Sequence, residues 1–238
     1  MPLKTDLEQV KKEVKIIIRA VPIKEESELF ISHPMTNTVI TYVPDSNNNP
    51  KPVNLAKKKD LKEWLSFCDR IIEEADSVGV LMLRILKPYK LTMLKYCKPY
   101  IEKKEFSECL ADAWVMSENP NDDVNCSVSE LIGWFKEADQ RSLMSDKEYK
   151  VWKSLPNKMT LYRGVANGHN PKGLSWTLKR EKAEWFRDRW KDSSIFAKND
   201  RYLLQAEVNK KDCFCYFNSR GEEEIVVNTS KIKSKRID

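Results

Sequence analysis

Cationic, hydroxyl and carboxylate side chains follow one another in the second half of this 238-residue chain. Arg163 lies in LYRGV, Ser175 and Thr177 lie in LSWT, and Glu222 and Glu224 belong to the acidic run that precedes IVV. A guanidinium binds anionic oxygens through paired N–H donors, and hydroxyls orient a ligand or a carboxylate. Neighbouring carboxylates on one face raise each other's pKa and favour proton transfer or a cationic ligand. These residues are therefore candidates for an anion-binding and proton-transfer site.

Arg163 and Gly164 each allow a structural interpretation beside the functional one. Arg163 alternates with Leu161 and Val165, so a strand here places the guanidinium on the same face as apolar side chains. Such an arginine binds an anionic ligand, joins a buried ion pair, or extends its charge to solvent at the edge of the sheet. Gly164 indicates either a β-bulge or a close approach of another backbone.

The hydroxyl pair and the acidic run, each taken alone, also allow both a functional and a structural interpretation. Ser175 and Thr177 share one face of a predicted strand. In a strand, Glu222 and Glu224 also project from one face and Glu223 from the other. The structural alternatives are an ordinary polar strand and an acidic turn in front of an edge strand.

Composition favours a globular protein that needs no disulfide or metal to fold. Apolar residues make up 41% of the chain, charged residues 33%, and the mean hydropathy is -0.60. No apolar stretch approaches the roughly 20 residues that span a bilayer, and the charged N-terminus lacks an apolar core, so we expect no membrane span and no secretory signal. The six cysteines form no CxxC pair. We expect them to be free thiols and the protein to be cytoplasmic, either in the cell that makes it or in a host cell.

The histidine content and the charge distribution indicate which kinds of site and ligand to expect. The two histidines, His33 and His169, have no Cys or carboxylate at metal-ligand spacing, so no metal is expected and histidine acid–base chemistry is disfavoured. The net charge is +6, and residues 156–238 carry 18 Lys and Arg against 11 Asp and Glu, whereas residues 1–155 carry 24 against 25. A basic domain favours anionic ligands such as nucleotide phosphates or nucleic acid, with a solvated basic face as the alternative.

The elements that must position these residues change in character along the chain. Residues 14–21 and 36–43 are β-branched runs that predict strands, and residues 43–52 have the composition of a loop. Apolar residues at spacings of three and four then predict helices at residues 61–75, 80–86, 91–97 and 106–114. The N-terminal half is therefore expected to be mixed but mainly helical.

The C-terminal half begins with helices and continues with strands. Two capping boxes, Ser127-x-x-Glu130 and Ser145-x-x-Glu148, predict helix starts before LIGWF and YKVW. Strands are predicted at residues 159–165, 174–178, 202–208, 213–217 and 224–229, interrupted by a helix at about residues 179–190. The basic tail KIKSKRID is expected to be a frayed terminus.

The order of these motifs resembles the R-S-E class of mono-ADP-ribosyltransferases, the cholera-toxin-like, arginine-modifying branch with bacterial and phage members. The matching residues are Arg163 in LYRG, Ser175 and Thr177 in LSWT, and Glu222 and Glu224 in EEEIVV. The resemblance covers about residues 127–230 and does not extend to residues 1 to about 120. It implies an α+β fold in which flanking helices and a two-sheet β core enclose an NAD+ cleft.

The resemblance also implies a role for each matching residue. Family members cleave the bond between nicotinamide and ribose of NAD+ through an oxocarbenium-like transition state. Glu224 would hold the ribose 2′-hydroxyl and stabilise the developing positive charge. Glu222 would orient and deprotonate the acceptor, and a glutamate at this position goes with arginine acceptors. Arg163 would bind the phosphates or ribose, Ser175 would position Glu224, and Thr177 would support the pocket.

Some assignments stay open on the sequence. Glu223 is the alternative catalytic residue in another register of the acidic run, and Glu224 is preferred because it directly precedes the apolar residues. The ring that stacks on nicotinamide is Phe186 or Phe217, and Gly164 would allow the cofactor to approach the backbone. The middle motif is S-W-T rather than the commoner S-T-S, which places a bulky tryptophan on the core-facing side.

We therefore expect an α+β chain with a mixed, mainly helical region at residues 1–125 and a catalytic domain at residues 126–238. The expected function is transfer of ADP-ribose from NAD+ to an arginine of a protein acceptor, without a metal. Residues 1–125 would dock the target or act as a structural cap. The alternatives are an NAD glycohydrolase, a catalytically silent interaction module of the same fold, and a nucleic-acid-binding domain.

Overall fold

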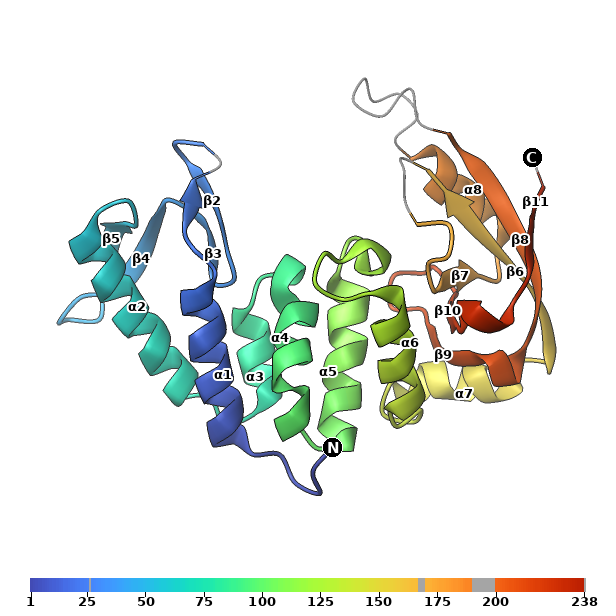
Figure 1. Ribbon diagram of the computed structural model, residues 1–238, viewed down its shortest axis with the longest axis horizontal. Helices are drawn as coiled ribbons and strands as arrows, with labels where there is room; N and C mark the ends of the chain where they lie inside the picture. Colours follow the sequence, from blue (N-terminus) through green and yellow to red (C-terminus); the bar gives the residue numbers. More distant parts are fainter. Residues whose placement is uncertain (26, 167–169, 190–199, 238) are drawn as a thin grey trace. The chain divides into compact units, whose positions relative to one another are not determined.

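Two compact units, Met1–Glu118 and Asn119–Asp238, make up the chain. The computed structural model describes residues 1–25, 27–166, 170–189 and 200–237 (Figure 1). The sequence placed the boundary after residue 125. The short 3-10 turn η3 (Pro120–Asp122) belongs to the second unit because Asn121 and Asp122 hydrogen-bond to the segment 170–175.

Helices build most of the core of the first unit. Its elements are α1 (Leu7–Ala20), β1 (Lys24–Glu25), β2 (Phe30–His33), β3 (Thr36–Thr38), β4 (Ile40–Pro44), β5 (Pro50–Asn54), α2 (Lys58–Glu73), α3 (Val78–Arg84), α4 (Lys90–Cys97) and α5 (Lys103–Met116). Strands β1 to β3 form an antiparallel sheet, and β4 pairs with β5. Leu94 on α4 and Phe106 and Trp114 on α5 are fully buried. The helices predicted between residues 61 and 114 are confirmed, with boundaries shifted by a few residues.

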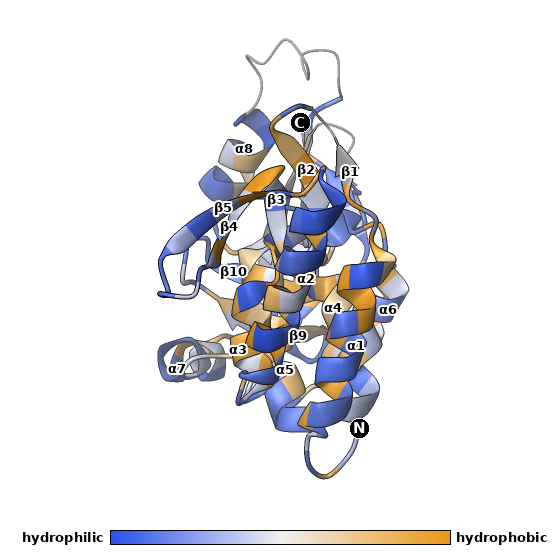
Figure 2. Ribbon diagram, turned by 90° about the vertical axis from the view of Figure 1, so that its left-hand side faces the viewer, coloured by the Kyte–Doolittle hydropathy of each residue, from blue (hydrophilic) through white to orange (hydrophobic). Residues whose placement is uncertain are grey.

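The predicted strand at residues 14–21 is wrong, because these residues belong to helix α1. Its buried apolar side chains recur at helical spacing: Val10, Val14, Ile17 and Ile18. Asp6 caps the helix by accepting a hydrogen bond from the Gln9 amide at 3.1 Å. Hydrophilic and hydrophobic bands alternate along α1 in Figure 2. Burial of one helix face therefore outweighs the weak strand preference of the β-branched run.

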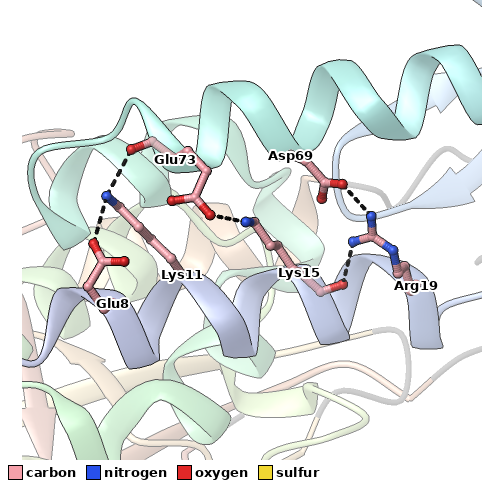
Figure 3. A network of polar contacts seen from close by, with 6 residues as sticks. All are labelled: Glu8, Lys11, Lys15, Arg19, Asp69 and Glu73. Atoms are coloured by element: carbon pink, nitrogen blue, oxygen red, sulfur yellow. Dashed lines mark hydrogen bonds and ion pairs between the residues drawn. The ribbon is translucent and has the colours of Figure 1, made fainter.

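The polar side of α1 contacts α2 through cationic side chains (Figure 3). Lys11 Nζ donates to the backbone carbonyl of Glu73 at 2.8 Å, and Lys15 forms an ion pair with the Glu73 carboxylate. One turn further along, Arg19 pairs with Asp69 at 2.6 Å. Exposed pairs of this kind contribute about 0–1 kcal/mol each, so they align the two helices more than they stabilise them.

His33 is a buried polar residue at the end of β2. Its Nε2 lies 2.7 Å from the carbonyl oxygen of Ile18, and its Nδ1 accepts a hydrogen bond from the Met35 amide at 3.1 Å. Its ring meets that of Trp64 edge-on at a centroid distance of 5.0 Å. Because Nδ1 is an acceptor and Nε2 faces a carbonyl, the imidazole is neutral with its proton on Nε2. Burial lowers the pKa of His33, and the hydrogen bond to Ile18 opposes that shift.

The second unit combines two capped helices with a sheet and one further helix. Its α-helices and strands are α6 (Val128–Glu137), α7 (Asp146–Ser154), β6 (Lys158–Val165), β7 (Ser175–Thr177), α8 (Arg180–Asp188), β8 (Tyr202–Asn209), β9 (Cys213–Phe217), β10 (Glu224–Val227) and β11 (Ser234–Arg236). Both predicted capping boxes are present, at Ser127 with Glu130 and at Ser145 with Glu148. α8 contacts β6 and β8, and α7 contacts β9.

Within the described part of this unit, six strands form one antiparallel sheet in the order β11-β8-β6-β7-β10-β9. This confirms an α+β class but corrects the expectation of two sheets. Among the described residues, β6 and β7 are joined by the single register pair Tyr162–Thr177, so two three-stranded halves meet at that pair. The tail is not frayed throughout, because β11 pairs with β8 through Arg236 and Leu204.

The environment of His33 predicts a pH dependence of stability. The unfolded chain binds a proton near pH 6.5, whereas the folded chain resists protonation because the imidazole is buried. The stabilisation that the folded chain gains from a neutral His33 is therefore complete above pH 6.5 and is lost progressively as the pH falls from 6.5 toward the lower pKa of the folded chain. We expect urea unfolding to give a lower free energy of unfolding at pH 5.5 than at pH 7.5.

The His33→Gln variant should lose much of that difference, because its side chain does not titrate. An unchanged pH dependence in His33→Gln would show that other groups are responsible.

Candidate active site

Arg163 is buried at the junction between the two halves of the sheet. The residues of β6 alternate in burial, and the Arg163 side chain lies on the covered side with 8% of the residue exposed. One terminal nitrogen donates to the carbonyl oxygen of Ser175 at 2.7 Å, and the other donates to that of Asn170 at 3.0 Å. Among the described residues no partner is found for its buried Nε. The guanidinium thus ties β6 to the segment that leads into β7.

Two carboxylates act electrostatically on this guanidinium, while its hydrogen bonds go to backbone carbonyls. Burial lowers the pKa of Arg163 to about 10, and the charges of Asp122, Glu224 and Tyr202 oppose that shift. The group is therefore cationic at neutral pH. The arginine is therefore a buried cation and does not extend its charge to solvent. It is held by hydrogen bonds to backbone carbonyls, and the charges of Asp122 and Glu224 favour its cationic form.

Asn121 is a buried residue of the site that sequence reasoning missed. Its side-chain oxygen accepts a hydrogen bond from the Leu174 amide at 2.6 Å, and its side-chain nitrogen donates to the Ser175 hydroxyl at 3.2 Å. Asp122, the next residue, accepts from the Asn170 amide at 3.1 Å. The turn at residues 120–122 therefore orients both the segment held by Arg163 and the Ser175 hydroxyl. No local pattern marks it, because its partners lie about fifty residues along the chain.

Thr177, Glu224 and Phe217 lie side by side across three strands. Glu224 pairs in register with Thr177 on β7 and with Phe217 on β9. Residues that are directly opposite in an antiparallel pair point to the same face, so these side chains form a row. Tyr162 of β6 continues the row through its pair with Thr177. Glu224 is 6% exposed and Phe217 is also buried.

Glu222 and Glu223 precede the strand instead of belonging to it. Strand β10 begins at Glu224, and Glu223 has a positive φ of 46°. The expectation that Glu222 and Glu224 share one strand face is therefore wrong, because the backbone turns between them. The Thr177 hydroxyl donates to the Glu222 carbonyl oxygen at 2.7 Å, which keeps this turn beside the row. Glu223 pairs with Lys179 at 2.7 Å.

The two aromatic candidates occupy different places. Phe217 is opposite Glu224 in the row. Phe186 is half-buried on α8, where its ring meets that of Trp185 at 5.0 Å and the Arg189 guanidinium lies 5.6 Å from its centre. The structure thus brings Phe217 to the carboxylate. His169 and Trp190, the predicted last residue of this helix, lie outside the described residues.

Glycines at the site make room for the protein itself. A Cβ at Gly164 would lie 2.1 Å from the carbonyl oxygen of Ala183 and 2.6 Å from the Arg187 amide nitrogen. The close backbone approach predicted at Gly164 is therefore to helix α8. A Cβ at Gly173 would lie 2.3 Å from the Arg163 guanidinium. Glycine at this position lets the buried arginine reach its carbonyl partners.

The described part of the chain contains neither a reactive cysteine nor a metal-binding cluster that the contacts and burial reveal. The six cysteines are free and buried. Burial raises the pKa of Cys68, Cys97, Cys109 and Cys213 to about 12, so these thiols are weak nucleophiles at neutral pH. The described residues include no group of three or more His, Cys, Asp or Glu side chains arranged to bind a metal ion. In the described ranges, no helix has both the length and the apolar character to cross a membrane.

Comparisons with protein-family models, curated proteins and solved structures find no match to this chain.

The packing of Gly164 against α8 predicts a large effect of adding one methyl group. We expect Gly164→Ala to lower the free energy of unfolding by about 1–3 kcal/mol or more, because the Cβ would overlap backbone atoms that cannot move independently. Gly133 is the matched control, since it lies in α6 and a Cβ added there would meet no atom within 4 Å.

Gly133→Ala should instead raise stability by up to about 1 kcal/mol, as expected for a helical glycine. Chemical unfolding of the two variants and the unsubstituted chain measures both effects. Equal stability of Gly164→Ala and the unsubstituted chain would mean that α8 does not pack on β6 as described.

Proposed function

We propose that this chain transfers ADP-ribose from NAD+ to an arginine side chain of a protein. The observation that carries the proposal is the placement of Arg163, Ser175 and Glu224 on the adjacent strands β6, β7 and β10. Arg163 bonds the backbone carbonyl of Ser175, and Glu224 is in register with Thr177 of the same strand as Ser175. These are the positions on which the resemblance to R-S-E mono-ADP-ribosyltransferases rests. A buried carboxylate beside polar side chains at a strand junction suits a reaction that develops positive charge.

Glu224 is the residue that faces the developing charge. Breaking the bond between nicotinamide and ribose leaves an oxocarbenium-like ribose, and a carboxylate held in a largely buried site stabilises it without reorganising solvent. The Thr177 and Phe217 side chains flank Glu224 in the row and limit its motion. Phe217 is the ring that we assign to the nicotinamide, because it lies opposite this carboxylate.

Ser175 and Arg163 act as positioning residues in this scheme. The Ser175 oxygen accepts a hydrogen bond from Asn121, which leaves its own proton for donation to the ribose or to a carboxylate. The Arg163 guanidinium fixes the two backbone carbonyls at residues 170 and 175 and supplies a buried positive charge near an anionic substrate. Lysine could not replace it, since one ammonium lacks the planar fork that reaches both carbonyls.

Glu222 serves the acceptor. Its side chain is 17% exposed, so it is accessible to an incoming group, and its backbone carbonyl is anchored by Thr177. A carboxylate in this position orients a guanidinium through charge-assisted hydrogen bonds and takes its proton when the new bond forms.

Glutamate-to-glutamine variants separate these two roles. We expect Glu224→Gln to reduce NAD+ cleavage by about 10²–10³-fold, because the amide keeps the shape and removes the stabilising charge. Glu222→Gln should lose transfer to a guanidine but retain cleavage with water as acceptor. Nicotinamide release and labelling of agmatine, a small free guanidine, measure the two activities side by side.

The control is Glu207→Gln, since Glu207 is exposed on β8 and bonds only Thr160 among the contacts described for it. It should leave both activities unchanged. Unreduced nicotinamide release by Glu224→Gln, or no release by the unsubstituted chain, would refute the proposed function.

A further inference from the structure

The side chain of Arg220 lies against Glu222, the carboxylate that we assign to the acceptor. A terminal guanidinium nitrogen of Arg220 donates to Glu222 Oε2 at 2.9 Å. The arginine side chain is 45% exposed, whereas that of Glu222 is 17% exposed. The guanidinium therefore approaches a mostly covered carboxylate from the solvent side, which is also the route open to an acceptor arginine.

The turn at residues 218–223 holds this pair in place. The Gly221 amide donates to the carbonyl oxygen of Asn218 at 3.0 Å, and Gly221 has a positive φ of 67°. The Asn218 side chain accepts a hydrogen bond from the Glu223 amide at 3.0 Å, and Glu148 of α7 accepts one from the Asn218 amide at 2.7 Å. The backbone on both sides of Arg220 is thus fixed by hydrogen bonds, while its long side chain keeps access to solvent.

The cations at this turn are matched to different carboxylates. Lys179 pairs with Glu223 at 2.7 Å, and Arg220 pairs with Glu222. The Arg220–Glu222 pair brings together a guanidinium, which is the group that the proposed reaction modifies, and the carboxylate that would take its proton. An exposed ion pair adds little stability, so stability alone gives no strong reason for this arrangement.

We propose that Arg220 is itself an acceptor and that the chain ADP-ribosylates it within one molecule; this inference rests on the proposed function. A guanidino nitrogen of Arg220 would attack C1″ of the nicotinamide ribose and form the new C–N bond. The bond to nicotinamide would break, and nicotinamide would leave with its electron pair as a neutral molecule. The proton released by the guanidinium would pass to Glu222.

Mass spectrometry of the full chain after incubation with NAD+ tests this inference. We expect the intact mass to rise by one ADP-ribose, and peptide mapping to place the group on Arg220. The rate constant of modification should not depend on protein concentration, because the reaction occurs within one molecule. The Arg220→Lys variant should remain unmodified at that position.

Arg180→Lys is the matched control, since Arg180 is an exposed arginine of the same unit and also pairs with a carboxylate, Glu184, at 2.9 Å. It should be modified at Arg220 as fast as the unsubstituted chain. Agmatine labelling in parallel separates this inference from the proposed function. Labelled agmatine with an unmodified chain, or with label only at other residues, would overturn the inference and leave the proposed function standing. Modification whose rate constant rises with protein concentration would overturn the single-molecule mechanism, and failure to release nicotinamide would overturn both proposals.

Discussion

A guanidinium buried in a protein must have hydrogen-bond acceptors, since an unpaired charge there is strongly destabilising. Arg163 meets this requirement with the backbone carbonyls of Ser175 and Asn170. The segment before β7 must therefore run close to β6, and it can do so because Gly173 has no side chain in the way. Asn121 completes the arrangement by bonding the same segment from its other side. The position of the candidate site follows from the hydrogen-bonding needs of the buried Arg163 guanidinium.

The carboxylates depend on that junction in turn. Since β7 is held beside β6, it offers Thr177 as the register partner of Glu224 and as the hydrogen-bond donor to the Glu222 carbonyl. One threonine thereby fixes both a strand glutamate and a turn glutamate. The result is a division of labour by burial: Glu224 is covered within the sheet, and Glu222 remains partly open to solvent beside Arg220. Such a difference in environment lets two carboxylates perform different chemistry.

Local signals in the sequence predicted most elements, and longer-range contacts account for the errors. Both capping boxes and the five main strands of the second unit follow from patterns within a few residues. The strand predicted over residues 14–21 failed because a helix buries the same apolar residues. The role of Asn121 could not be predicted because its hydrogen-bond partners are distant in sequence. The placement of Glu222 outside β10 depends on the positive φ of Glu223, which a non-glycine residue rarely adopts.

A crystal structure of the full-length Glu224→Gln chain with NAD+ tests the central claim most directly. The claim is that the β6–β7–β10 junction binds the nicotinamide ribose, while Arg163 supports the wall of the site. We expect the ribose beside residue 224 and Ser175, the nicotinamide ring against Phe217, and the Arg163 guanidinium still bonded to the carbonyls of Ser175 and Asn170. NAD+ bound elsewhere on the chain, or a junction that stays empty at saturating NAD+, would contradict it.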